Sequence, residues 1–127
     1  MARSLVVKLT ALGDTWPPPT AELERVAQAL TVATTALASG IPTSVWLTGE
    51  ATRLATPGYA ARLTLPHAAP FEDLVDLLLG AEVVTVCTQC AARRGLTEAD
   101  LLPGARIAGA AGFVEQALTE GAQALVY

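Results

Sequence analysis

The fold is decided by residues 82–95, which read EVVTVCTQCAARRG. The apolar, β-rich run from Glu82 to Val86 is typical of a buried strand, and the Ala-rich residues after it are typical of a short helix that Gly95 ends. Cys87 stands at the turn between the two. In open α/β sheets, ligands bind outside the carboxyl ends of the strands, so this stretch predicts a thiol at the functional edge of a sheet.

The same alternation of strand and helix extends outward in both directions. Further strands are predicted at Ser4–Leu9, Thr43–Leu47, Ala105–Ala108 and Ala122–Tyr127. Helices are predicted from the N-cap Thr20 to Gly40, at Phe71–Gly80 and at Gly112–Thr119, with short turns of helix at Glu50–Leu54 and Thr97–Asp100. We therefore expect an α/β fold, with a parallel sheet of about five strands, helices on both faces and a single domain over residues 1–127.

Composition narrows the class of protein. Hydrophobic residues make up 52% of the 127 residues, and the mean hydropathy is +0.44. This is high for a small monomer, so we expect a homo-oligomer that buries part of the apolar surface. The net charge is −4, and the basic residues are scattered apart from the pair Arg93-Arg94. A nucleic-acid binder would need a basic stripe, so binding of nucleic acid is excluded.

No stretch of the sequence predicts a membrane span or a signal peptide. The apolar run from Leu77 to Val86 is interrupted by Glu82 and is too short to cross a bilayer. The residues after Met1 enter the first predicted strand at once. We therefore expect a cytoplasmic protein with no membrane contact. In that compartment two cysteines three residues apart favour redox, sulfur or metal chemistry over a structural disulfide.

The position of Cys87 favours nucleophilic chemistry. Backbone N–H groups at a helix start stabilise a thiolate, and they lower a cysteine pKa below its free value of about 8.5. Arg93 and Arg94, about two turns along, would add positive potential or hold an anionic sulfur donor. A packed, inert cysteine is the alternative, but two cysteines at CxxC spacing favour attack on a persulfide or a disulfide.

The segment Val86–Leu96 resembles the signature of the DsrE/DsrF-like (YchN-like) family, which includes the TusD-type sulfur-relay subunits. That signature has a strand, a cysteine, five residues and then Arg-Arg-Gly. Cys87 falls on the family's sulfur-accepting cysteine, and Cys90 on a position that is often Ala and sometimes Cys. The resemblance implies a flavodoxin-like three-layer sandwich, a trimer or hexamer, and a persulfide on Cys87. Gly49-Glu50 and the loop Trp16–Pro19 depart from the family pattern and point to a different substrate or partner.

Other residues carry weaker signals. Cys90 is either a resolving thiol or a buried small residue. Asp14 and Glu50 follow the first two strands at the same sheet edge, where turn capping competes with substrate binding. His67 is predicted in a surface loop. One histidine and two cysteines fall short of a four-ligand zinc site, and no phosphate-binding glycine motif occurs, so no metal or cofactor is expected. Trp46 is assigned to the core or to a subunit interface.

These observations lead to three hypotheses. The first is a sulfur carrier or sulfurtransferase-like protein that accepts sulfane sulfur on Cys87 and relays it between donor and acceptor proteins. Its candidate site comprises Cys87 and Cys90 for the chemistry, with Arg93, Arg94, Glu50 and Asp14 for binding. The second is a dithiol redox protein that cycles a Cys87–Cys90 disulfide. The third is a non-catalytic oligomeric protein that binds a small ligand beside Cys87.

Overall fold

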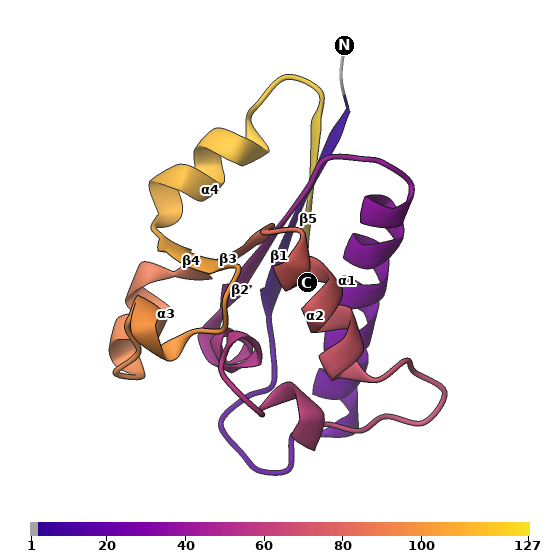
Figure 1. Cartoon of the computed structure of the whole chain (residues 1–127), viewed down its shortest axis with the longest axis vertical. Coiled ribbons are helices and arrows are strands. Elements are labelled where there is room, and N and C mark those ends of the chain that lie inside the picture. Colours follow the sequence, from indigo (N-terminus) through magenta and orange to yellow (C-terminus); the bar gives the residue numbers. More distant parts are fainter. Residues whose placement is uncertain (1–2) are drawn as a thin grey trace.

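A five-stranded parallel sheet forms the middle layer of the computed structural model, which describes residues 3–127 (Figure 1). The strand order is β4-β3-β2-β1-β5, and every neighbouring pair is parallel. The strands are β1 (Ser4–Thr10), β2 (Thr43–Thr48), β3 (Val84–Cys87), β4 (Ala105–Ala108) and β5 (Ala122–Val126). The predicted parallel sheet of five strands is confirmed.

Helices cover both faces of the sheet, as predicted. The long α1 (Thr20–Ala38) and α2 (Phe71–Gly80) lie side by side on one face, and α4 (Ala110–Ala117) lies on the other (Figure 1). The short α3 (Thr88–Arg93) follows β3 directly. Three 3₁₀ helices complete the chain at Gly49–Ala55, Ala60–Arg62 and Glu98–Asp100. Within residues 3–127 no helix combines the length and the apolar character that crossing a membrane requires.

The dry core lies between the sheet and the α1–α2 layer. Strand alternation sends Val7 and Leu9 of β1 toward this layer, and both are fully buried. Apolar residues at helical spacing on α1, such as Val26 and Leu30, pack against them with 0% and 1% exposure. Removal of this surface from water is the main force that holds the layers together.

Several predicted boundaries are wrong by one or two residues, and three of them have a clear physical cause. Pro19, not Thr20, is the N-cap of α1, because the Pro19 carbonyl already accepts the first helical hydrogen bond, from the Leu23 N–H at 3.1 Å. Glu82 has a φ of 58° and still bonds back to α2, so β3 begins only at Val84. Extended Gly109 starts α4 two residues earlier than the apolar pattern indicated.

The face toward α4 is less well covered. Trp46 of β2 is 3% exposed there, which assigns it to the core. The Phe113 ring of α4 meets Trp46 edge to face at 5.7 Å, and the indole N–H donates to Gln116 at 2.8 Å. However, none of residues 102–127 is buried. A single short helix therefore leaves much of this face only partly shielded from water.

Candidate active site

Cys87 is both the last residue of β3 and the N-cap of α3. The strand is apolar and buried up to Val86, so the chain reaches the surface at Cys87 and turns there into the helix. Its backbone is extended, with φ −62° and ψ 129°, and its side chain is partly exposed. The thiol thus lies at the carboxyl edge of the sheet, as the strand-turn-helix pattern predicts.

Its surroundings favour the charged form of the Cys87 thiol. Burial raises the pKa of Cys87, but hydrogen bonds from the backbone N–H and side chain of Cys90 and from the backbone N–H of Gln89 oppose this. The positive charge of Lys8 adds to their effect. The net result is a pKa below that of an ordinary thiol, so more of Cys87 is present as thiolate near neutral pH.

Cys90 lies one turn inside α3 and is only 8% exposed. Its sulfur accepts a hydrogen bond from the backbone N–H of Gly49 at 3.2 Å. Gly49 adopts a φ of +58°, and a Cβ at this position would lie 3.2 Å from the Thr10 methyl group. The positive φ and the nearby Thr10 methyl group both favour glycine at this turn, whose N–H is aimed at the sulfur. Both cysteines are free thiols, and they lie close together.

An ion-pair cluster joins α3 to the 3₁₀ helix Gly49–Ala55. The Arg94 Nε donates to Glu50 at 2.9 Å, Arg94 also donates to the Cys90 carbonyl at 3.0 Å, and Arg53 pairs with the other Glu50 oxygen. Burial raises the pKa of Glu50, but hydrogen bonds from Arg53 and Arg94 outweigh this and lower the pKa. Arg94 and Glu50 are about one-fifth exposed, so the pair clamps the segment that carries Cys90.

Comparison with known proteins identifies the family of this chain. The model of the DsrE/DsrF-like family matches residues 17–127, which include both cysteines, Glu50 and Arg94. The chain belongs to the DsrE/DsrF-like family. No curated protein matches it.

Two solved structures share the fold of this DsrE-like chain. The YchN protein from E. coli aligns with a TM-score of 0.68 at 16% identity, over 100% of both chains. MTH1491 from Methanobacterium thermoautotrophicum, a protein of unknown function, aligns with a TM-score of 0.63 at 16% identity, over 98% of this chain and 99% of that one. At this identity the likeness concerns the fold alone, and the chemistry must be argued from the residues.

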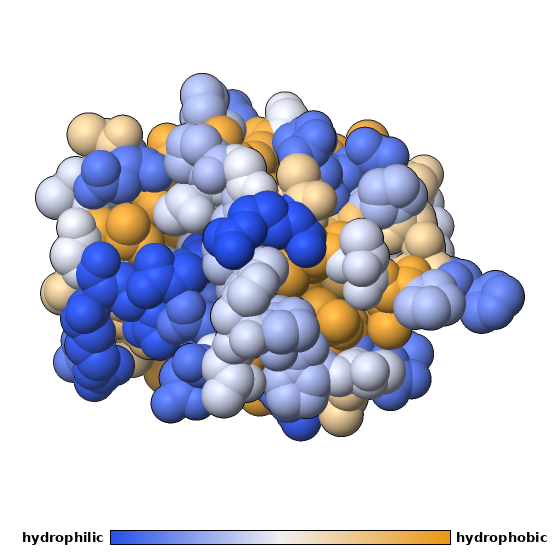
Figure 2. All heavy atoms as spheres, turned by 90° about the horizontal axis from the view of Figure 1, so that it is seen from below, coloured by the Kyte–Doolittle hydropathy of each residue, from blue (hydrophilic) through white to orange (hydrophobic). Residues whose placement is uncertain are grey.

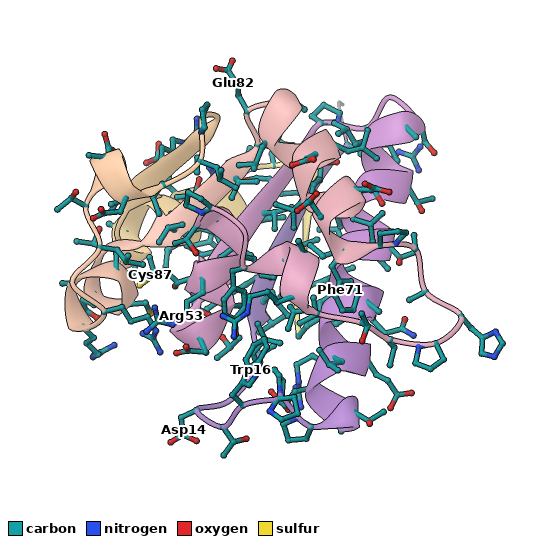
Figure 3. The ribbon with its side chains drawn as sticks, turned by 60° about the horizontal axis from the view of Figure 1, so that its bottom comes forward. Asp14, Trp16, Arg53, Phe71, Glu82 and Cys87 are labelled. Carbon is teal, nitrogen blue, oxygen red and sulfur yellow. The ribbon has the colours of Figure 1, made fainter. Side chains whose placement is uncertain are left out.

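Not all of the other predicted site residues lie beside the thiol in this DsrE-like fold. Arg93 is exposed on α3. Asp14 is exposed at the tip of the loop between β1 and α1, well apart from Cys87 (Figure 3). Two cavities, of about 340 and 300 Å³, share Asp14 and Glu50 in their walls. His67 is exposed in the loop before α2, which confirms its surface position.

The sequence analysis did not single out Lys8, Tyr59 or Arg62 near this edge. The sequence places Lys8 inside a predicted apolar strand, where a lone lysine marks a polar position on one face of the sheet. Arg62 stacks on the half-exposed Trp16 ring at 4.0 Å, and Trp16 meets Tyr59 edge to face.

Figure 2 shows the surface at the carboxyl ends of the strands. Strongly hydrophilic side chains gather on one side of this surface, and apolar side chains are exposed among polar ones nearer its centre.

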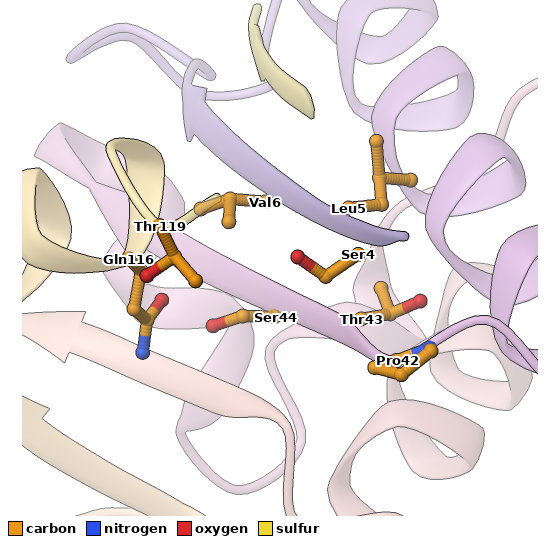
Figure 4. Close-up of a pocket in the computed structure, with 8 residues that line it drawn as sticks. All are labelled: Ser4, Leu5, Val6, Pro42, Thr43, Ser44, Gln116 and Thr119. Atoms are coloured by element: carbon orange, nitrogen blue, oxygen red, sulfur yellow. The ribbon is translucent and has the colours of Figure 1, made fainter. Parts of the chain in front are cut away.

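A third cavity lies at the opposite end of the sheet, between the starts of β1 and β2 and the end of α4 (Figure 4). It measures about 170 Å³, and its walls include Ser4, Ser44 and Gln116 but no titratable side chain. It therefore offers neither a thiol nor an acid or base. Within residues 3–127, no three His, Cys, Asp or Glu side chains come together in a way that would hold a metal ion.

Proposed function

We propose that this protein is a sulfur carrier that accepts sulfane sulfur as a persulfide on Cys87 and passes it to a partner thiol. The observation that supports it most directly is the partly exposed Cys87 thiol at the end of β3, whose pKa is held below its ordinary value. A thiolate is the nucleophile in such transfers. Membership of the DsrE/DsrF-like family, which is commonly associated with sulfur relay, supports the same proposal.

The proposed loading step is a substitution at sulfur. The Cys87 thiolate attacks the outer sulfur of a donor persulfide, R–S–SH, and a new S–S bond forms between this sulfur and Cys87. The S–S bond of the donor breaks, and its electron pair leaves with R–S⁻, so that atoms and charge balance without an added oxidant. Unloading repeats the step, with an acceptor thiolate that attacks the outer sulfur and releases the Cys87 thiolate.

The neighbouring residues have supporting roles in this proposal. Cys90 is close enough to the Cys87 sulfur to act as a resolving thiol, and the Gly49 N–H holds it in place. Arg94 and Glu50 position the first turn of α3 through their ion pair and the hydrogen bond to the Cys90 carbonyl. Exposed Arg93 and Asp14 are left to contact donor or acceptor proteins at the rim, and the cytoplasm, where thiols stay reduced, is the proposed compartment.

Mass spectrometry after incubation of the reduced protein with a low-molecular-weight persulfide tests this proposal. We expect a mass gain of one sulfur atom, about 32 Da, that tandem fragmentation places on Cys87 and that dithiothreitol removes. A protein whose mass stays unchanged at full donor excess would contradict the sulfur-carrier function. A loss of two hydrogen atoms in place of the gain would favour the second candidate.

That second candidate is a dithiol redox protein, and the closeness of the two thiols favours it. In this reaction Cys87 attacks a partner disulfide, Cys90 attacks the mixed disulfide, and the partner leaves as two thiols while a Cys87–Cys90 disulfide forms. Buried Cys90 accepts a hydrogen bond from Gly49 and contacts Cys87, which is the arrangement that a resolving thiol requires.

We also propose that the protein is a homo-oligomer, with a trimer or hexamer expected. The segment that runs from β4 through α4 to β5 contains no buried residue, and three of its apolar side chains are strongly exposed. They are Val114 at 50%, Leu118 at 80% and Val126 at 67%. Val114 and Leu118 are four residues apart at the end of α4, so they share one side of the helix and form an apolar patch there, while Val126 is exposed on β5. A second copy of the chain is the partner that would cover this patch.

Light scattering of the protein at micromolar concentration is expected to show an assembly larger than one chain. Leu118→Asp should shift this assembly toward smaller species, because it places a charge in the patch. Leu77→Asp is the matched control, since Leu77 is 59% exposed on α2, outside the patch. A monomeric wild-type protein, or equal dissociation by both variants, would contradict the proposed interface.

A further inference from the structure

Lys8 is an unusual residue on the face of the sheet that carries Cys87. In the register of the sheet, Lys8 of β1 lies level with Trp46 of β2, which is level with Thr85 of β3. Residues paired in this way point to the same face, and Cys87 lies two residues beyond Thr85, so alternation returns it to that face as well. Two strand spacings and two residues place the Cα atoms of Lys8 and Cys87 about 12 Å apart.

The positive charge of Lys8 is not paired with an acid. The three ion pairs formed within residues 3–127 do not include Lys8, whose ammonium instead lies over the Phe113 ring, 5.3 Å from its centroid. The side chain is only partly exposed. An aromatic face attracts a cation but carries no net charge, so the charge of Lys8 remains uncompensated. A partly buried cation without a counter-charge favours the approach of an anion.

Other groups on this face strengthen that field. Arg106 of β4 is level with Thr85, so a second cation flanks the row on the other side of β3. The Thr85 hydroxyl is buried, and it has no hydrogen-bond partner among the described residues. The charge of Lys8 also acts on Cys87 itself, since it lowers the pKa of that thiol. The face that carries Cys87 thus has positive potential and, below it, a buried hydroxyl without a partner among the described residues.

We propose that Lys8 forms an anion subsite beside Cys87, so that the donor which loads Cys87 is a small thiol persulfide carrying a carboxylate or another negative group. The chemical class of the donor rests on the proposed sulfur-carrier function, whereas the anion subsite itself does not. Lys8 attracts the negative group of R–S–SH to this face, and the Cys87 thiolate attacks the outer sulfur. The leaving thiolate, R–S⁻, departs with its electron pair from the same positive field.

Alkylation of Cys87 by a charged and a neutral reagent tests the subsite without any sulfur transfer. Iodoacetate is an anion and iodoacetamide is neutral, and both attack the same thiolate, so the ratio of their rates cancels any change in thiolate fraction. Tandem mass spectrometry assigns the label to Cys87 in the full chain. Lys8→Met is expected to lower the iodoacetate-to-iodoacetamide ratio roughly threefold to tenfold at low salt. Lys8→Arg should keep the ratio near that of the wild type.

Arg25→Gln is the matched control, because it also removes one cation, from an exposed position on α1 away from this face. Its ratio should match the wild type, and high ionic strength should bring the wild-type ratio toward that of Lys8→Met. An unchanged ratio in Lys8→Met, or an equal fall in Arg25→Gln, would overturn the assignment. Light scattering and thermal unfolding verify that each variant keeps the assembly and fold of the wild type.

Persulfides of 3-mercaptopropionate and 2-mercaptoethanol then test the donor class, since they differ in a carboxylate and a hydroxyl. The wild type should load faster from the anionic donor, and Lys8→Met should lose this preference. Equal loading of the wild type from both donors would overturn the donor class. Failure of both donors to load the wild type would overturn the sulfur-carrier function, while the alkylation ratio would still decide whether Lys8 attracts anions.

Discussion

Replacement of Cys87 by serine is expected to abolish persulfide loading, while replacement of Cys90 by serine leaves loading intact and lengthens the lifetime of the persulfide. Serine has no thiolate, so the attacking group is lost in the first variant. In the second, the thiol that would displace the outer sulfur is absent, and the persulfide persists. Mass spectrometry of each variant, sampled over time after removal of the donor, measures both effects.

The two thiols should also differ in their reaction with iodoacetamide. Cys87 is partly exposed and has a lowered pKa, whereas Cys90 is 8% exposed. The alkylation rate of Cys87 should rise with pH as the thiolate forms and reach its plateau at a lower pH than that of a free cysteine, because the folded protein stabilises the charged form. Faster alkylation of Cys90 than of Cys87 at neutral pH would show that the roles are reversed.

Replacement of Gly104 by alanine is expected to be among the most destabilising single changes in the chain. Gly104, just before β4, has a φ of +97°, which side chains rarely adopt. A Cβ there would lie 2.9 Å from the carbonyl carbon of Leu79 and closer still to its oxygen, at the end of α2. Backbone strain and this clash with a rigid helix end should together lower the free energy of unfolding by about 3 to 5 kcal/mol.

Urea unfolding, followed by far-UV circular dichroism, measures this loss. Gly58→Ala is the matched control, because Gly58 also has a positive φ, +78°, but no atom lies within 4 Å of a Cβ at that position. It should cost only about 1 to 2 kcal/mol from backbone strain. Losses of similar size in the two variants would show that the packing of Gly104 against Leu79 adds nothing.

Local sequence patterns were sufficient for the elements and for the position of the thiol. The β-rich run before Cys87 and the Ala-rich run after it predict a strand, a turn and a helix, and this turn is where the structure places Cys87. Among the boundaries that were wrong, those at Pro19, Glu82 and Gly109 depend on the backbone conformation of a single residue. Apolar periodicity reports which residues face a core, and it carries little information about the first or last residue of an element.

The environment of the thiols depended on contacts between distant residues. The hydrogen bond from Gly49 to Cys90 joins residues 41 positions apart, and the one from Arg94 to Glu50 joins residues 44 positions apart. The sequence favours turn capping or substrate binding for Glu50, but the structure shows it bound by two arginines. No local pattern encodes such pairs, because they depend on which loops meet at the sheet edge.

The sequence by itself determined the α/β class, the sequence of strands and helices, and the cysteine at the end of a strand. These follow from side-chain periodicity and from turn residues, which act over a few positions. Only the tertiary structure decided that Lys8 shares the face of Cys87, because that depends on the strand order and on the register of three strands. Strand order is the result of packing over the whole chain, and it therefore cannot be read from any one segment.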